Sequence, residues 1–389
     1  MTSVSRDVGV LITADLVVAG GQVLAPGWLD LDRGRVVALG SGVPPRPATQ
    51  GLGPVTVVPG FVDIHVHGGG GATFAADPDD ARTAVAQHRR HGTTTSLASL
   101  VTAPRDELPR LVAGAADLVD AGIVAGLHLE GPWLSQARCG AHRPDWLRDP
   151  EPAELEAVLA AGRGTIAMVT LAPERRGGLD AVRRLVDDGI VVAVGHTDGS
   201  YDQTRSAIDA GARVATHLFN AMRPIHHREP GPVVALLGDD RVVVEMIMDG
   251  VHVHPALYAG VVRQVGAERI ALVTDAMAAT GMPDGAYDLG SLGVTVTAGV
   301  ARLTDGDSIA GSTATMDQIF RTALAALVSG GSGPDDGLLA AVRQTSATPA
   351  RVLGRTGHDL SVGGVADLVV LDAQLQVTQV MQDGVWVDR

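Results

Sequence analysis

The stretch that decides the fold covers residues 190–220 and reads IVVAVGHTDGSYDQTRSAIDAGARVATHLFN. It opens with an apolar run of strand length, residues 190–196, and closes with a second run, residues 214–219. Between them, residues 200–210 have a helix-like composition and are followed by Gly211, a residue type that commonly ends helices. A strand, a helix and a second strand in this order predict a parallel βαβ unit.

The same alternation extends over most of the chain. Apolar runs of strand length recur eight times, at residues 57–67, 94–100, 123–130, 165–171, 190–196, 214–219, 242–248 and 270–275. The stretches between them include a helix expected at residues 79–91 and closed by Gly92. Nearly continuous apolar strands are typical of parallel sheets covered on both faces. The sequence therefore predicts an α/β fold in the form of a (β/α)8 TIM barrel.

Both ends of the chain have a different texture, with short strand-like runs separated by glycine and proline. Residues 15–23, 28–31 and 35–39 show it at the start, and residues 366–371 and 376–387 show it at the end. We expect the two ends to form one small β-sandwich. The predicted boundaries are residues 1–58 and 357–389 for the sandwich and residues 59–356 for the barrel. Residues 287–310 alternate like strands and predict a β excursion after the eighth barrel strand.

Composition excludes several classes of mechanism. The 389 residues carry a formal net charge of −14, and all 30 basic residues are arginine because lysine is absent. A P-loop lysine, a Schiff-base lysine and a carboxylated bridging lysine are therefore impossible. An acidic chain has no general attraction for nucleic acid or anionic membranes, so an anionic substrate needs a local basic site. With one cysteine, Cys139, the chain has no internal disulfide, which favours a reducing compartment.

Residues able to bind metal stand at the ends of the predicted strands, where barrel enzymes hold their catalytic groups. The first strand ends in His65-Val66-His67, and later strands end in Glu130, His196, His217 and Asp275. His65 and His67 point to the same side because side chains alternate along a strand. A single histidine at a strand end is more often structural. Imidazoles and carboxylates at five strand ends indicate a site for zinc or a similar divalent ion.

Several strings carry a resemblance to a known family. His128-Leu129-Glu130-Gly131-Pro132 and the string Thr-His-Leu-Phe-Asn-Ala-Met at residues 216–222 are its most specific parts. Residues 65–67, 195–197, 249–252, 274–276 and 310–312 add further matches in the right order. Together they resemble the N-acetylglucosamine-6-phosphate deacetylases of the amidohydrolase superfamily. The resemblance implies hydrolysis of N-acetylglucosamine 6-phosphate to glucosamine 6-phosphate and acetate.

The resemblance also implies roles for particular residues. Glu130, His196 and His217 match the metal ligands, with Glu130 in the place of the carboxylated lysine of relatives. His65 and His67 make a second metal plausible, so one or two Zn²⁺ ions are expected. Asp275 matches the catalytic aspartate, and His252 matches a histidine that binds the substrate carbonyl.

Further positions match substrate contacts of the family. They are Ala141, His142, Asn220, Ala221, Arg228, Ile309, Ala310 and Gly311. Arg228 would bind the phosphate, because arginine offers bidentate hydrogen bonds to such a group. His128 shares a face with Glu130 and is expected beside the ligands. His88 and His91 are expected to face solvent or to lie near the end of their helix.

Two alternatives stay open at this point. The first is another amidohydrolase that acts on a different N-acyl substrate, and the second is a non-catalytic protein on the same fold. The second is disfavoured because every expected ligand and Asp275 are present. We expect a cytoplasmic protein without a signal peptide or spanning helix, a small amino-sugar phosphate as substrate, no nucleic-acid or membrane partner and, from the resemblance, a homodimer.

Overall fold

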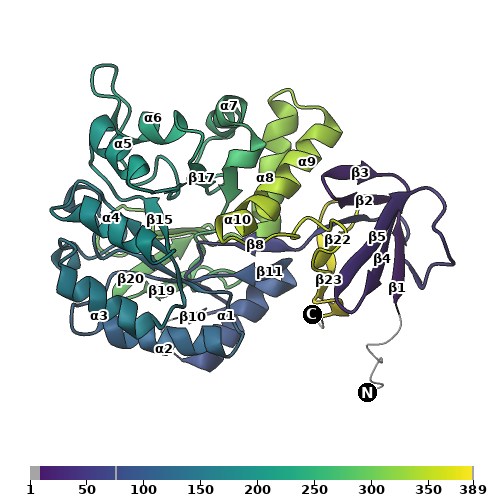
Figure 1. The fold of residues 1–389 in the computed structure, drawn as a ribbon, viewed down its shortest axis with the longest axis horizontal. Coiled ribbons are helices and arrows are strands. Elements are labelled where there is room, and N and C mark those ends of the chain that lie inside the picture. The colour runs from purple at the N-terminus through teal and green to yellow at the C-terminus, as the bar shows by residue number, and fades with distance from the viewer. Residues whose placement is uncertain (1–8, 75–76, 388–389) are drawn as a thin grey trace.

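The computed structural model describes residues 9–74 and 77–387. Figure 1 shows a large α/β body and, beside it, a small β domain in which both ends of the chain meet. Within the described ranges, no helix combines the length and the apolar character needed to cross a membrane.

The large body is built on parallel strands, which confirms the predicted α/β class. Its strands are β8 (Phe61–Asp63), β11 (Thr93–Ser96), β12 (Ala98–Leu100), β13 (Leu127–Glu130), β14 (Ile166–Leu171), β15 (Val191–Val194), β16 (Val214–Ala215), β17 (Val243–Met246) and β18 (Ile270–Leu272). β8 pairs with β11, and β12 to β18 form one parallel sheet in chain order. Beyond β18, the amide of Asp275 donates to His65 O at 2.8 Å and a parallel bridge joins Val66 to Ala276. The last strand is thereby joined to the first.

Helices cover the outside of this parallel sheet. They are α1 (Pro78–Arg90), α2 (Leu108–Asp120), α3 (Pro152–Gly162), α4 (Gly178–Asp187), α5 (Tyr201–Asp209), α6 (Gly231–Leu237), α7 (Pro255–Val265), α8 (Met316–Ser329), α9 (Pro334–Thr345) and α10 (Ala347–Val352). Local sequence explains their ends. Ser200 and Gln203 form a capping box at the start of α5, and Gly211 follows its end with a φ of 118°.

The small domain contains two sheets with a shared apolar core. One sheet holds β1 (Val10–Ala14), β4 (Gly27–Asp32), β5 (Arg35–Ser41) and β6 (Gln50–Gly51). The other holds β2 (Leu16–Ala19), β3 (Gln22–Leu24), β7 (Thr56–Pro59), β22 (Leu368–Leu371), β23 (Val377–Gln382) and β24 (Val385–Trp386). β7 and β22 pair antiparallel, so strands from both ends of the chain share one sheet.

Three details differ from the sequence-based expectations or refine them. The apolar run at residues 57–67 is not one strand, because β7 belongs to the small domain and only β8 to the large body. The expected β excursion is an antiparallel meander of β19 (Gly285–Leu289), β20 (Leu292–Thr297) and β21 (Val300–Leu303). His88 lies near the end of α1, as one alternative held, but it is buried rather than facing solvent.

Candidate metal centre and active site

A cavity of about 550 Å³ lies at the carboxyl ends of the parallel strands. The residues predicted from strand ends converge on it: His67, Glu130, His196, His217 and Asp275 line the cavity, and His65 is fully buried beside them. Each follows or ends a strand of the parallel sheet, so the fold brings residues from five separate strands to one centre.

Glu130 lies at the middle of this cluster. Its Oε1 is 3.0 Å from His196 Nε2 and 3.1 Å from His217 Nε2. Its Oε2 is 3.2 Å from His67 Nε2, and His67 Nε2 is also 3.1 Å from Asp275 Oδ1. His65 Nε2 lies 3.5 Å from Glu130 Oε1. With His142 Nε2 at 3.4 Å from Oε2, the Glu130 carboxylate contacts five imidazole nitrogens, and the Asp275 carboxylate lies beside it.

The hydrogen bonds behind these imidazoles fix which nitrogen carries the proton. His196 Nδ1 donates to Arg138 O at 2.9 Å, and His67 Nδ1 donates to Ser99 O at 3.2 Å, because a carbonyl can only accept. In the same way His65 Nδ1 donates to a carboxylate oxygen of Glu245 at 3.2 Å. In the neutral tautomer each ring then presents its Nε2 lone pair to the centre. This is the arrangement that metal-binding histidines adopt.

Two further histidines lie at the same centre with different surroundings. His142 Nε2 is 3.4 Å from Glu130 Oε2 and forms a possible metal-binding group with Glu130 and His196. Burial lowers the pKa of His142 to about 4, so its ring is neutral. His128 has both nitrogens occupied, by Ser99 Oγ and by Thr170 Oγ1, each at 2.9 Å. It lies beside the predicted ligands, as expected, and packs against His65.

The backbone at the centre is strained. His196, His217 and Asp275 have φ values of 46°, 25° and 48°, a left-handed region that side chains other than glycine rarely occupy. Such conformations cluster at functional sites, where surrounding structure holds them in place. Gly140 has a φ of 57°, and a Cβ there would lie 2.9 Å from His196 Cε1. The loop after β13 can therefore approach His196 only with a glycine at this position.

His252 and Asp275 approach the cavity from different strands. Asp249 Oδ2 accepts a hydrogen bond from His252 Nδ1 at 2.7 Å, and its Oδ1 accepts from the amides of Val251 and His252. Burial alone would lower the pKa of His252, but the Asp249 carboxylate raises it above its usual value. Burial would raise the pKa of Asp275, but His65 and His67 hold it below its usual value. Asp275 is therefore an ionised carboxylate at the cavity wall.

The other predicted substrate residues divide into two groups. One group lines the cavity: Ala141, His142, Asn220, Ala221, Ile309 and Gly311. Ala310 is buried next to them. Arg228 is exposed on the loop after β16, contacts His227 and does not line the cavity.

Sequence reasoning missed three residues of the site. Glu245, buried on β17, accepts hydrogen bonds from His65 Nδ1 and from the amide of His217. A charged residue inside an apolar strand run is a signal that could have revealed it. Arg138 and Arg302 also line the cavity, and they carried no signal in the sequence beyond their charge.

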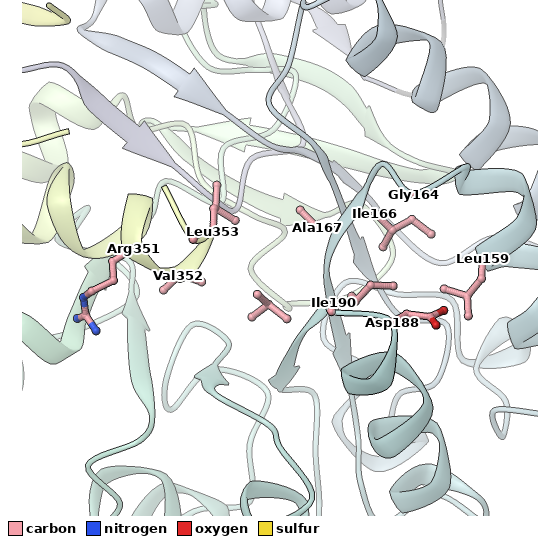
Figure 2. Close-up of a pocket in the computed structure, with 12 residues that line it drawn as sticks. Leu159, Gly164, Ile166, Ala167, Asp188, Ile190, Arg351, Val352 and Leu353 are labelled. Carbon is pink, nitrogen blue, oxygen red and sulfur yellow. The ribbon is translucent and has the colours of Figure 1, made fainter. Parts of the chain in front are cut away.

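A second hollow, of about 590 Å³, lies elsewhere in the large body. Figure 2 shows its lining, which includes Leu159, Ile166, Ile190 and Leu353. Ile166 begins β14 and Ile190 precedes β15, so this hollow lies at the amino ends of the strands. None of the residues that line the candidate active site lines this second hollow, so the two are separate.

Comparison with known families matches residues 56–387 to the amidohydrolase family. This chain belongs to that family. Among known proteins, this amidohydrolase is 39% identical over 333 residues to an N-acetylgalactosamine-6-phosphate deacetylase of Escherichia coli O157:H7, which covers 84% of this chain and 86% of the relative. It is 42% identical over 270 residues to the N-acetylglucosamine-6-phosphate deacetylase of Vibrio furnissii, which covers 68% of this chain and 67% of the relative.

Solved structures agree with the sequence relatives. An aspartate-to-alanine variant of N-acetyl-D-glucosamine-6-phosphate deacetylase from Mycobacterium smegmatis, in complex with N-acetyl-D-glucosamine-6-phosphate, is 58% identical. Its structure matches with a TM-score of 0.95 over 98% of this chain and 100% of the relative. The resemblance predicted from the sequence strings is confirmed at the level of the family.

Proposed function

We propose that this amidohydrolase hydrolyses N-acetylglucosamine 6-phosphate to glucosamine 6-phosphate and acetate. The observation that carries the proposal is the convergence of five possible metal ligands and Asp275 on one cavity at the strand ends. The Mycobacterium relative, whose structure holds this substrate, supports the substrate class at 58% identity. The fold we propose is a (β/α)8 barrel, residues 59–356, with a sandwich made from residues 1–58 and 357–389.

The residues at the centre fit a divalent cation. His65, His67, Glu130 and Asp275 form one possible metal group, and all four are buried. Imidazole and carboxylate ligands suit zinc, so we propose one or two Zn²⁺ ions. Glu130, His196 and His217 would hold the first, and His65 and His67 would hold the second. A divalent cation bound there would lower the pKa of a bound water to about 7 and polarise the substrate carbonyl.

The chain's own residues then move the proton. Asp275, ionised at the cavity wall, would accept a proton from the attacking water and deliver it to the leaving amine. His252, oriented by Asp249, would donate a hydrogen bond to the acetamide carbonyl oxygen as negative charge develops there. Asp249 accepts the hydrogen bond from Nδ1–H and raises the pKa of His252, so the protonated ring would present its Nε2–H to the substrate carbonyl.

The sugar would be held by the loops that line the cavity. We propose contacts from Ala141, His142, Asn220, Ala221, Ile309, Ala310 and Gly311, together with Arg228 for the phosphate. Arg228 does not line the cavity of its own chain, which supports a hypothesis in which it reaches the site of the partner in a homodimer.

A specific observation favours a second candidate substrate. One relative, 39% identical over 84% of this chain, is an N-acetylgalactosamine-6-phosphate deacetylase. The two substrates differ only in the orientation of one hydroxyl, so both would place the acetamide and the phosphate in the same positions.

The test is acetate release from purified enzyme loaded with zinc. Three substrates are compared: N-acetylglucosamine 6-phosphate, N-acetylgalactosamine 6-phosphate and unphosphorylated N-acetylglucosamine. We expect the highest kcat/KM for the first. A higher value for the second would reassign the sugar, and no acetate from any of them would refute the deacetylase proposal.

A further inference from the structure

Acidic side chains line the cavity, so a cationic side chain is needed there to bind an anionic substrate. Glu130, Asp275 and Asp307 all line it. The whole chain carries a net charge of −14, so no general field attracts a phosphate. Two arginines line the cavity, Arg138 and Arg302.

The positive charge of Arg138 is already compensated by an ion pair. Its Nε donates to Asp198 Oδ1 at 2.9 Å, and Asp198 also binds Arg223 at 2.8 Å through its other oxygen. Hydrogen bonds from both arginines hold the pKa of Asp198 below its usual value. The Arg138 side chain therefore ties the loop after β13 to the loop after β15, and its charge is compensated within this network.

Arg302 has no such partner among the described residues. Its Nη1 donates to Asp307 O at 2.8 Å, and no carboxylate forms an ion pair with its guanidinium within that part of the chain. A guanidinium has five N–H donors, so most of the donors of Arg302 stay available. The backbone contact fixes one edge of the group without cancelling its charge.

Arg302 lies on the face of the β19–β21 meander that is opposite to the apolar core of the meander. Ala301, the preceding residue of β21, is buried in the cluster with Val294 and Val296. Side chains alternate along a strand, so Arg302 lies on the opposite face, and it is exposed. An antiparallel bridge pairs Arg302 with Ile309, which also lines the cavity. The arginine is thereby anchored beside a segment proposed to contact the sugar.

We propose that Arg302 also binds the 6-phosphate of the substrate, from within the same chain, and so contributes with the proposed Arg228 contact to the preference for phosphorylated amino sugars. This inference rests on the proposed deacetylase function. A phosphate accepts two parallel N–H bonds from one guanidinium, a geometry that Arg302 can offer with its free edge. Arg228 does not line the cavity of its own chain, so Arg302 would supply a cation that does not depend on a partner subunit.

The test compares kcat/KM for N-acetylglucosamine 6-phosphate and unphosphorylated N-acetylglucosamine in wild type, Arg302→Met and Arg302→Lys. For Arg302→Met, losing a hydrogen bond to a charged group should lower the value for the phosphorylated substrate by roughly ten- to a hundredfold. The value for the unphosphorylated sugar should stay within about twofold, since that substrate makes no such contact. Arg302→Lys should recover part of the loss because it restores the charge without the bidentate geometry.

The matched control is Arg82→Met, which removes an exposed arginine that pairs with Asp79 on α1, outside the cavity. It should leave both values unchanged. An equal loss for both substrates in Arg302→Met, no loss for either, or the same selective loss in Arg82→Met would overturn the assignment. Wild-type enzyme that releases no acetate from either sugar would instead refute the proposed function itself, so the two failures are distinguishable.

Discussion

Glu245→Gln is the variant that tests the organisation of the proposed metal centre most directly. Glu245 is fully buried on β17, and one of its oxygens lies 3.2 Å from both His65 Nδ1 and the amide of His217. The glutamine side chain has the same shape but carries no charge. The exchange therefore removes the negative charge behind two proposed ligands and leaves the ligands themselves in place.

The expected magnitude follows from this geometry. A hydrogen bond to a charged group contributes about 1.5–3 kcal/mol, which corresponds to roughly ten- to a hundredfold in an equilibrium constant. The same range, about ten- to a hundredfold in metal affinity, is usual when a partner behind a ligand is changed. We expect Glu245→Gln to weaken zinc binding by this factor, with the larger effect at the site of His65.

The assay is a competition titration of metal-free protein with zinc and a chromophoric chelator, accompanied by thermal unfolding. Asp317→Asn is the matched control, because Asp317 is also a buried carboxylate that contacts a histidine, His91, but lies outside the cavity. It should affect stability alone. Unchanged zinc affinity in a folded Glu245→Gln protein, or an equal loss in the control, would refute the reasoning.

Four further predictions concern single residues. His217→Ala should abolish zinc binding and acetate release together, and His65→Ala should be milder; equal metal content in wild type and His217→Ala would contradict the ligand assignment. Asp275→Asn should keep its fold and its zinc but lose about 10²–10⁴-fold in kcat, and a loss below about tenfold would exclude proton transfer by this residue. Arg228→Met should lower kcat/KM roughly ten- to a hundredfold for the phosphorylated sugar only. If the arginine acts across a dimer, a hybrid dimer of Arg228→Met and Asp275→Asn subunits should regain activity. Burial lowers the pKa of His88 from 6.5 to about 4, so between these values the unfolded chain binds more protons than the folded chain and stability falls as pH falls. Calorimetry between about pH 7 and 5 should therefore show a smaller drop in Tm for His88→Asn than for wild type. Equal drops would contradict this account.

Much of the site could be predicted because parallel strands place their carboxyl ends together. Residues far apart in sequence, such as His65 and His217, follow different strands of the parallel body and still meet at one cavity. The position of each strand end is enough to predict where these residues meet, whatever the lengths of the helices and loops between the strands.

Strand boundaries at the first apolar run were harder to predict. Residues 57–67 are apolar throughout, yet β7 and β8 belong to different sheets, separated at Gly60. A Cβ at Gly60 would lie 2.3 Å from Thr94 Oγ1, so the chain passes closely here as it moves from one sheet to the next. Hydrophobicity could not reveal the change because the strands on both sides of it are buried.

Contacts behind the site histidines escaped prediction for a different reason. Glu245 hydrogen-bonds to His65 from within the apolar run at residues 242–248, a position that strand ends alone do not single out. Asp249 follows the end of that run, but nothing in the sequence indicates that its carboxylate contacts His252. Glu245 was nevertheless visible as the one charged residue in the apolar run at residues 242–248. A buried carboxylate requires a hydrogen-bonding partner, so such a residue points to a polar centre nearby.

The left-handed backbone at three site residues depends on contacts between segments that are distant in sequence. Histidine and aspartate adopt positive φ at a cost of about 1–3 kcal/mol, and only surrounding contacts can maintain it. At His196 the contact is its Nδ1 bond to Arg138 O, and at Asp275 it is the amide bond to His65 O. Each bond joins one strand end to a different segment of the site. The conformations of His196 and Asp275 are therefore held by contacts distant in sequence, and the same contacts direct these side chains toward the cavity.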